Sequence, residues 1–122
     1  MSYKELKVWQ TSIDLVTDIY KITEDFPQNK LYGLTSQMCR AAVSVPSNIA
    51  EGNGRAHEKE YLHFLHLAKG SLLELMTQLE IANRLNFLEH NRKVVVNQHC
   101  ELTLKMLHRL IAAIKKHSAS KQ

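Results

Sequence analysis

The stretch ELTLKMLHRLIAAIKK, residues 101–116, is decisive for the fold class of this chain. On a helix of 100° per residue, its apolar side chains share an arc of roughly 200° and its cationic ones occupy the remainder. The apolar set is Leu102, Leu104, Met106, Leu107, Leu110, Ile111, Ala113 and Ile114. This periodicity predicts an amphipathic helix from about residue 92 to residue 116, with a polar tail at 118–122.

Three other segments have apolar residues at the same helical period. They predict helices over about residues 6–25, 34–52 and 58–86. Pro27 is expected to end the first of them, because proline disfavours helix at the residue before it. Glycines just after residue 51 are expected to end the second.

Two helix-disrupting residues lie inside these segments. The apolar phase continues across Pro46, so we expect one helix kinked at Pro46 in preference to a break with a new helix starting near Ser47. Gly70 lies in the middle of the third helix, where glycine costs about 1 kcal/mol relative to alanine. We expect that Gly70 permits close approach of a neighbouring helix.

The composition favours one all-α domain over residues 1–122. The chain has 122 residues with only 4 Gly and 2 Pro, which disfavours a turn-rich β fold. Short connections between long helices predict an antiparallel up-down-up-down four-helix bundle. The apolar arcs are wider than a monomeric bundle needs, so we also expect a homo-oligomer.

The absence of certain sequence features predicts where the protein is located and the redox state of its cysteines. No apolar run approaches 18 residues and the N-terminus has no signal-peptide core, so we expect a cytoplasmic protein without a membrane partner. Cys39 and Cys100 have no nearby Cys or His ligands, which favours two reduced thiols over a metal site.

The positive charge is concentrated in the last quarter of the chain. Residues 1–90 have nine bases against eleven acids, whereas residues 91–122 have seven bases and one acid. The polar face of the last helix has five side chains that could contact the phosphates of nucleic acid. They are Lys105, His108, Arg109, Lys115 and Lys116. The alternative is an ordinary solvated face with cations near a helix C-terminus.

A polar stripe flanks the apolar face of the second helix. Its members, spaced by three or four residues, are Gln37, Arg40, Ser44, Asn48 and Glu51. The third helix offers Ser71, Glu74 and Gln78 on its own flank. We expect a partly buried seam that fixes helix register or a subunit interface, with Arg40 paired to Glu74 or Glu51. A ligand pocket is the alternative.

The sequence contains little that resembles an enzyme site. Glu60 and His63 have the Glu-x-x-His spacing of di-iron bundles, but no second copy exists. Arg84 and His90 have the spacing of an acid/base and phosphate-steadying pair used by some RNA-cleaving helical bundles, which we retain as a remote alternative. We therefore expect no catalytic residues, metal or cofactor.

The segment from Leu34 to Gly52 resembles a known family, the four-helix bundle proteins encoded by intervening sequences in bacterial 23S ribosomal RNA genes. The similarity extends in order over residues 6–112. Supporting segments are Leu6–Trp9, Phe26–Pro27, Tyr61–Phe64, Ala68–Ser71 and Glu74–Leu75.

The resemblance implies a four-helix bundle that forms a barrel-shaped homopentamer in relatives. It also implies kinship with the accessory protein of diversity-generating retroelements, a basic protein that binds a reverse transcriptase and nucleic acid. The possible partners of this chain are therefore RNA, DNA or a reverse-transcriptase-like protein. The resemblance supplies no catalytic residues.

Overall fold

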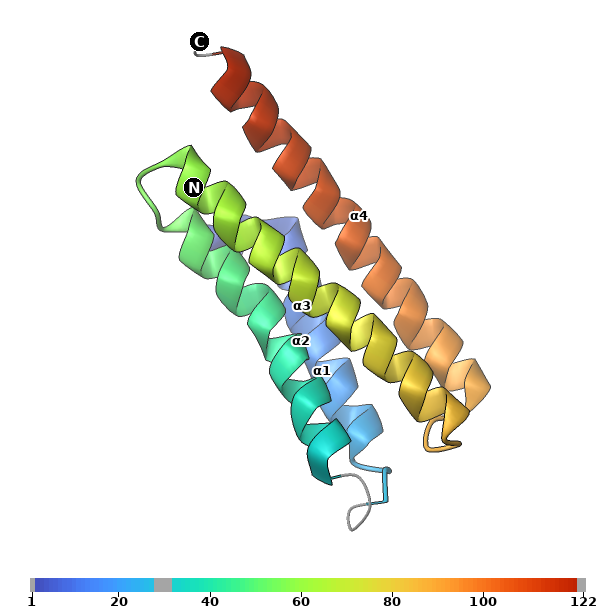
Figure 1. Ribbon diagram of the computed structural model, residues 1–122. Helices are drawn as coiled ribbons and strands as arrows, with labels where there is room; N and C mark the ends of the chain where they lie inside the picture. Colours follow the sequence, from blue (N-terminus) through green and yellow to red (C-terminus); the bar gives the residue numbers. More distant parts are fainter. Residues whose placement is uncertain (1, 28–31, 121–122) are drawn as a thin grey trace.

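The chain folds as four long α-helices. The computed structural model describes residues 2–27 and 32–120. The helices are α1 (Lys7–Thr23), α2 (Tyr32–Asn53), α3 (Glu58–Arg84) and α4 (His90–Ser120), and a short 3-10 turn, η1 (Tyr3–Glu5), precedes them. The chain reverses direction from each helix to the next (Figure 1). The described residues contain no strand, so the predicted all-α four-helix fold is confirmed.

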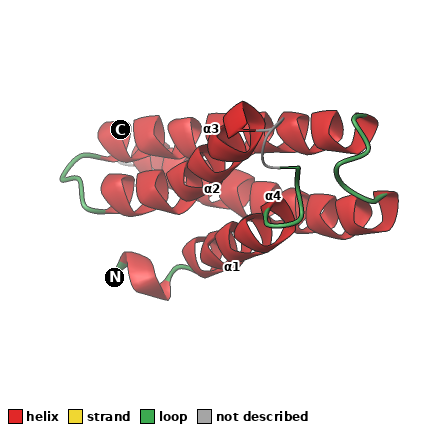
Figure 2. Ribbon diagram, turned by 90° about the horizontal axis from the view of Figure 1, so that it is seen from below, coloured by secondary structure: helices red, strands yellow, loops and turns green. Residues whose placement is uncertain are grey.

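Each helix packs against two others around one apolar core. Helices α1 and α3 each contact both α2 and α4 (Figure 2). The largest fully buried side chains come from all four helices: Leu15, Ile19, Met38, Ile49, Leu65, Leu72, Leu75, Leu79 and Leu107. No helix of the described residues combines the length and apolar character needed to cross a bilayer.

The ends of α1 and α3 lie slightly inside their predicted limits. Helix α1 stops at Thr23, whose hydroxyl donates to the carbonyl of Ile19 at 2.9 Å. Helix α3 stops at Arg84 because Asn86 adopts a left-handed backbone with φ of 63°. Asparagine tolerates this conformation at the residue that terminates a helix.

Helix α2 passes through Pro46 without interruption. Its single run, Tyr32–Asn53, rules out the alternative of a break and a new helix near Ser47. Pro46 is buried, so the proline ring lies on the packed side of the helix. The kink at Pro46 stays a prediction.

The C-terminal end of α4 is longer than expected. The helix continues to Ser120, so the predicted polar tail is wrong for residues 118–120. Contacts with the first residue of α3 stabilise this end: Ser118 Oγ donates to Glu58 Oε1 at 3.0 Å, and His117 Nδ1 contacts Glu58 Oε2. Lys121 and Gln122 lie outside the described residues.

The two helical glycines have opposite environments. Gly70 is exposed and a Cβ built on it would meet nothing within 4 Å, so the expected close approach of a neighbouring helix is wrong within this chain. Gly52 is buried, and a Cβ there would lie 2.8 Å from Phe64 Cβ and 3.0 Å from Tyr61 Cδ1. The glycine that permits close packing is therefore at the end of α2.

Candidate nucleic-acid interface

The basic face of α4 points away from the core. All five predicted contact residues are exposed: Lys105, His108, Arg109, Lys115 and Lys116. The apolar side of the same helix is buried through Cys100, Leu107 and Ile111, so packing of α4 on α1 and α3 fixes which side faces solvent.

The cations of this face differ from the paired cations elsewhere in the bundle. Arg55, Arg84, Arg92 and Lys93 all have carboxylate partners. Ion pairs within the described residues include none of the five α4 side chains. The sequence has no acid after Glu101, so the last two-thirds of α4 offers no carboxylate that could neutralise them.

Helix α3 brings further basic side chains to the same end of the bundle. Two contacts set the antiparallel register of α3 and α4: Lys93 Nζ to Glu80 Oε1 at 2.9 Å, and Ser118 to Glu58. Because both helices rise about 1.5 Å per residue, this register places Lys59 level with Lys115.

The same register extends along the two helices. It places His66 level with His108, and Lys69 level with Lys105. The sequence patterns missed this group, because charges on different helices become neighbours only through the tertiary register.

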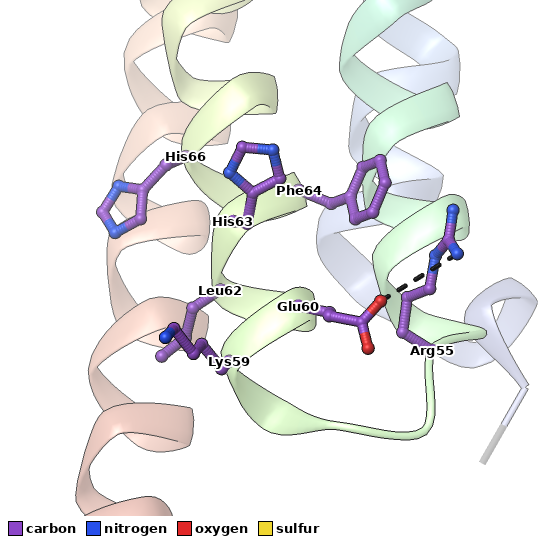
Figure 3. A pocket seen from close by; sticks show the side chains of 7 residues that line it. All are labelled: Arg55, Lys59, Glu60, Leu62, His63, Phe64 and His66. Atoms are coloured by element: carbon purple, nitrogen blue, oxygen red, sulfur yellow. Dashed lines mark ion pairs between the residues drawn. The ribbon is translucent and has the colours of Figure 1, made fainter.

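An open hollow of about 610 Å³ lies at the start of α3. Figure 3 shows that Lys59 and His66 point toward α4, whereas Glu60 and Phe64 point toward α2. On the α2 side, Arg55 pairs with Glu51, lies 4.0 Å from Glu60 and stacks 4.8 Å above the Phe64 ring. The Arg55 guanidinium therefore already contacts neighbouring side chains. In contrast, no ion pair within the described residues involves Lys59 or His66.

The predicted polar seam between α2 and α3 is only partly assembled. Ser71 Oγ donates to Ser44 Oγ at 2.9 Å across the two helices, and Asn48 Nδ2 donates to the same hydroxyl at 2.9 Å. Gln78 Nε2 donates to Glu74 Oε1 at 3.3 Å within α3. Gln37 is exposed at the far end of the stripe.

The predicted ion pair of Arg40 is wrong. Within the described residues Arg40 is exposed and has neither Glu74 nor Glu51 as a partner. Glu51 pairs instead with Arg55, two residues beyond the end of α2, and Glu74 accepts from Gln78. In both cases a residue four positions away on the same chain segment reaches the carboxylate, which needs less side-chain ordering than a pair between helices.

The two residues considered for RNA cleavage lie on either side of the turn between α3 and α4. Arg84 Nε donates to Glu80 Oε2 at 2.8 Å, so its charge is already matched by a carboxylate, and His90 begins α4 beyond the turn. Lys93 and Arg84 lower the pKa of Glu80 to about 2. In the part of the chain that the structure describes, no group of three or more His, Cys, Asp or Glu could hold a metal ion.

His99 and the two thiols lie in or beside the core. His99 Nδ1 contacts Asp18 Oδ2 of α1 at 2.8 Å, as expected for a histidine with a partner at a helix interface. Cys39 is half-buried and Cys100 fully buried, and neither is in a disulfide. Burial, with Glu101 and Asp18 nearby, raises the pKa of the Cys100 thiol to about 12.

These features define an all-α four-helix bundle with an unpaired basic surface at one end. The family model described as 23S rRNA-intervening sequence protein matches residues 4–109. The chain therefore belongs to the 23S rRNA-intervening sequence protein family.

A solved structure supports the fold. The chain is similar to a protein of unknown function from the S23 ribosomal protein family of Bacteroides thetaiotaomicron, with a TM-score of 0.80 and 19% sequence identity. The alignment covers 86% of this chain and 95% of that chain. Among curated proteins, none matches the chain.

Proposed function

We propose that this protein is a non-enzymatic, homo-oligomeric bundle that presents the basic face of α4 to nucleic acid or to a nucleoprotein partner in the cytoplasm. The observation that carries the proposal is the exposed, unpaired set of cations on α4, in a segment without acids. Clustered lysine and arginine side chains bind phosphates and release counterions, so the affinity depends on salt.

A salt titration tests the nucleic-acid part of this proposal. Binding of a fluorescein-labelled 20-nucleotide RNA is measured by anisotropy from 50 to 200 mM salt. Replacing Lys105, Arg109, Lys115 and Lys116 together by Glu should abolish binding, because phosphates then face four carboxylates. A control variant with three charge reversals elsewhere, Lys4, Lys21 and Arg40 to Glu, should retain most of the affinity. RNA binding that is unchanged by the α4 substitutions would disprove the proposal.

The oligomeric part rests on an apolar surface formed by α1 and α2. Ile13, Tyr20 and Val43 are 38%, 49% and 40% exposed. Ile13 and Val43 line an open groove of about 270 Å³, together with Trp9, Val16, Pro46 and Ala50. A second copy of the chain would remove this apolar area from water. We propose a pentamer, as the family resemblance implies.

Light scattering tests the assembly. The native chain should have several times the 14.0 kDa mass of one copy. Ile13→Glu combined with Val43→Glu should yield a folded monomer, because a buried carboxylate at an apolar contact is strongly unfavourable. Leu73→Glu on α3, where Leu73 is 44% exposed, is the matched control and should leave the mass unchanged. A native monomer would disprove this part.

A structural role through protein partners alone is the second candidate. Exposed apolar side chains favour this role because they offer further contact area; they include Leu67 and Ile81 of α3, and Leu85 just after it. An absence of RNA and DNA binding at 50 mM salt, together with a stable oligomer, would favour this role over nucleic-acid binding.

A further inference from the structure

We propose that a nucleic-acid strand lies on the surface that α3 and α4 form side by side, with phosphates contacted by Lys59, His66 and Lys69 of α3 as well as by the basic face of α4. This inference rests on the proposed nucleic-acid binding and adds a second helix to the surface. A strand would then contact cations of two neighbouring helices.

The first argument is the alignment of charge across the two helices. The register set by Lys93 with Glu80 and by Ser118 with Glu58 places basic side chains of α3 and α4 in three consecutive levels. From Lys59 to Lys69 these levels span about 15 Å, since each residue rises about 1.5 Å. This length matches roughly four steps of a nucleic-acid strand in a duplex, at about 3.4 Å per step.

The second argument is the disposition of the acids at this end. Glu58 is engaged by His117 and Ser118. Glu60 points away from α4, toward Arg55 (Figure 3). Glu101, which accepts from Asn97 at 3.1 Å, lies one turn beyond Lys105. The acids of this end are therefore directed away from the basic levels or paired beside them, so the surface shared by α3 and α4 favours an anion.

The third argument favours nucleic acid over an acidic polypeptide. The exposed imidazole of His63 lines the same hollow as Lys59 and His66, and it meets the ring of Phe64, which points toward α2, edge to face at 5.5 Å. His63 is exposed and Phe64 is half-buried, so a base could stack on the imidazole. Cationic grooves interleaved with rings are typical of surfaces that bind single strands.

The experiment neutralises two lysines of α3 and compares the result with the charge-reversed α4 variant described above. Lys59→Gln with Lys69→Gln should weaken binding of a 20-nucleotide RNA roughly tenfold at 50 mM salt. The slope of log affinity against log salt should fall by about 1.4, which is two phosphate contacts at about 0.7 each. Lys4→Gln with Lys21→Gln, two exposed lysines near the two ends of α1, is the matched control and should change neither value. Circular dichroism checks that each variant stays helical.

The outcomes separate this inference from the proposed function. If the α3 and the α4 substitutions both weaken RNA binding, the result supports the proposed function and the α3 contacts. Loss of binding in the α4 variant with native affinity in the α3 variant would overturn the α3 contacts and leave the proposed function intact. Native protein that binds poly-glutamate as tightly as RNA, or binds no RNA at all, would overturn both.

Discussion

The contact between α2 and α3 and the attachment of α4 are made of different interactions. Small and apolar side chains dominate between α2 and α3, where Gly52 packs on Tyr61 and Phe64 and where the Ser44–Ser71 bond crosses the helices. Helix α4 adds two ion pairs to its apolar contacts, Arg92 with Asp25 just beyond α1 and Lys93 with Glu80 of α3. It also makes two histidine–carboxylate contacts, His99 with Asp18 of α1 and His117 with Glu58 of α3. The first contact is specified by shape, while the second also depends on charge.

This difference bears on the candidate site. The ion pairs of α4 are partly exposed, for example Arg92 with Asp25 at 2.9 Å, where both side chains are over 40% accessible. Exposed pairs are worth about 0.2–1 kcal/mol each and are screened by salt. The helix with the basic face is therefore attached by interactions that respond to the same ionic conditions as nucleic-acid binding, whereas α2 and α3 form a scaffold insensitive to them.

The largest expected effect comes from the buried core of α2. Ile49 is fully buried, so Ile49→Ala should lower the free energy of unfolding by about 2–5 kcal/mol, through lost burial and the cavity left behind. Urea denaturation measures this free energy, and the decrease caused by Ile49→Ala should be equal at 0.1 and 1 M salt. Leu73→Ala, at a side chain 44% exposed, should change stability by less than about 0.5 kcal/mol. If Ile49→Ala and Leu73→Ala lowered the stability equally, buried side-chain packing would not be what stabilises the contact between α2 and α3.

The two glycines give the next largest difference. Gly52→Ala should destabilise the protein by about 1–3 kcal/mol, because its Cβ would overlap Phe64. Gly70→Ala, on open surface, should stabilise it by up to about 1 kcal/mol through helix propensity. Thermal unfolding compares the pair. A stabilising Gly52→Ala would show that α2 and α3 can separate at little cost.

The reactivity of Cys100 reports on detachment of α4. In a Cys39→Ser background, iodoacetamide at pH 8 should modify Cys100 only when α4 opens, because the thiol is buried and its pKa is raised to about 12. Raising the salt from 0.1 to 1 M should accelerate labelling about fivefold, since the ion pairs are screened.

A variant without two of these pairs is the control for the labelling. Asp25→Asn with Glu80→Gln removes the partners of Arg92 and Lys93. Labelling of this variant should be faster at 0.1 M salt and should depend less on salt. If the labelling rate of Cys100 in the native protein did not change with salt, the ion pairs would contribute nothing to the attachment of α4.

The smallest effect is expected from acid titration of Glu80. Its pKa, lowered from 4.5 to about 2 by Lys93 and Arg84, means that the folded chain keeps this carboxylate charged where the unfolded chain protonates it. The stabilisation is thus present above about pH 4.5 and is lost as the pH falls toward 2. Glu80→Gln should narrow the difference in melting temperature between pH 6 and pH 3. Glu24→Gln, at an exposed α1 carboxylate, should leave that difference unchanged.

The fold was largely predictable, because apolar spacing alone places the helices. The long runs from Tyr61 to Ala82 and from Leu102 to Ile114 have one buried side each. Helix ends were less predictable, since they depend on single residues such as Asn86 and on contacts such as Ser118 with Glu58. The basic face of α4 was identified correctly as exposed, because the amphipathic pattern also defines the solvent side.

What the sequence could not supply is which side chains meet across helices. Arg40 and Glu74 lie on facing stripes, yet neighbours four residues away satisfy both acids that were expected to pair with Arg40. Gly70 and Gly52 are both glycines within helical segments, and the sequence does not distinguish their surroundings. Only Gly52 packs against a second helix.

By itself, the sequence determined the four amphipathic helices, the residues that face the core and the excess of positive charge near the C-terminus. These follow from the period of one helix and from residue chemistry. Only the tertiary structure decided that Lys59, His66 and Lys69 stand level with the basic face of α4. That alignment depends on the register of two antiparallel helices, which packing and the Glu58 and Glu80 contacts fix far apart in the chain.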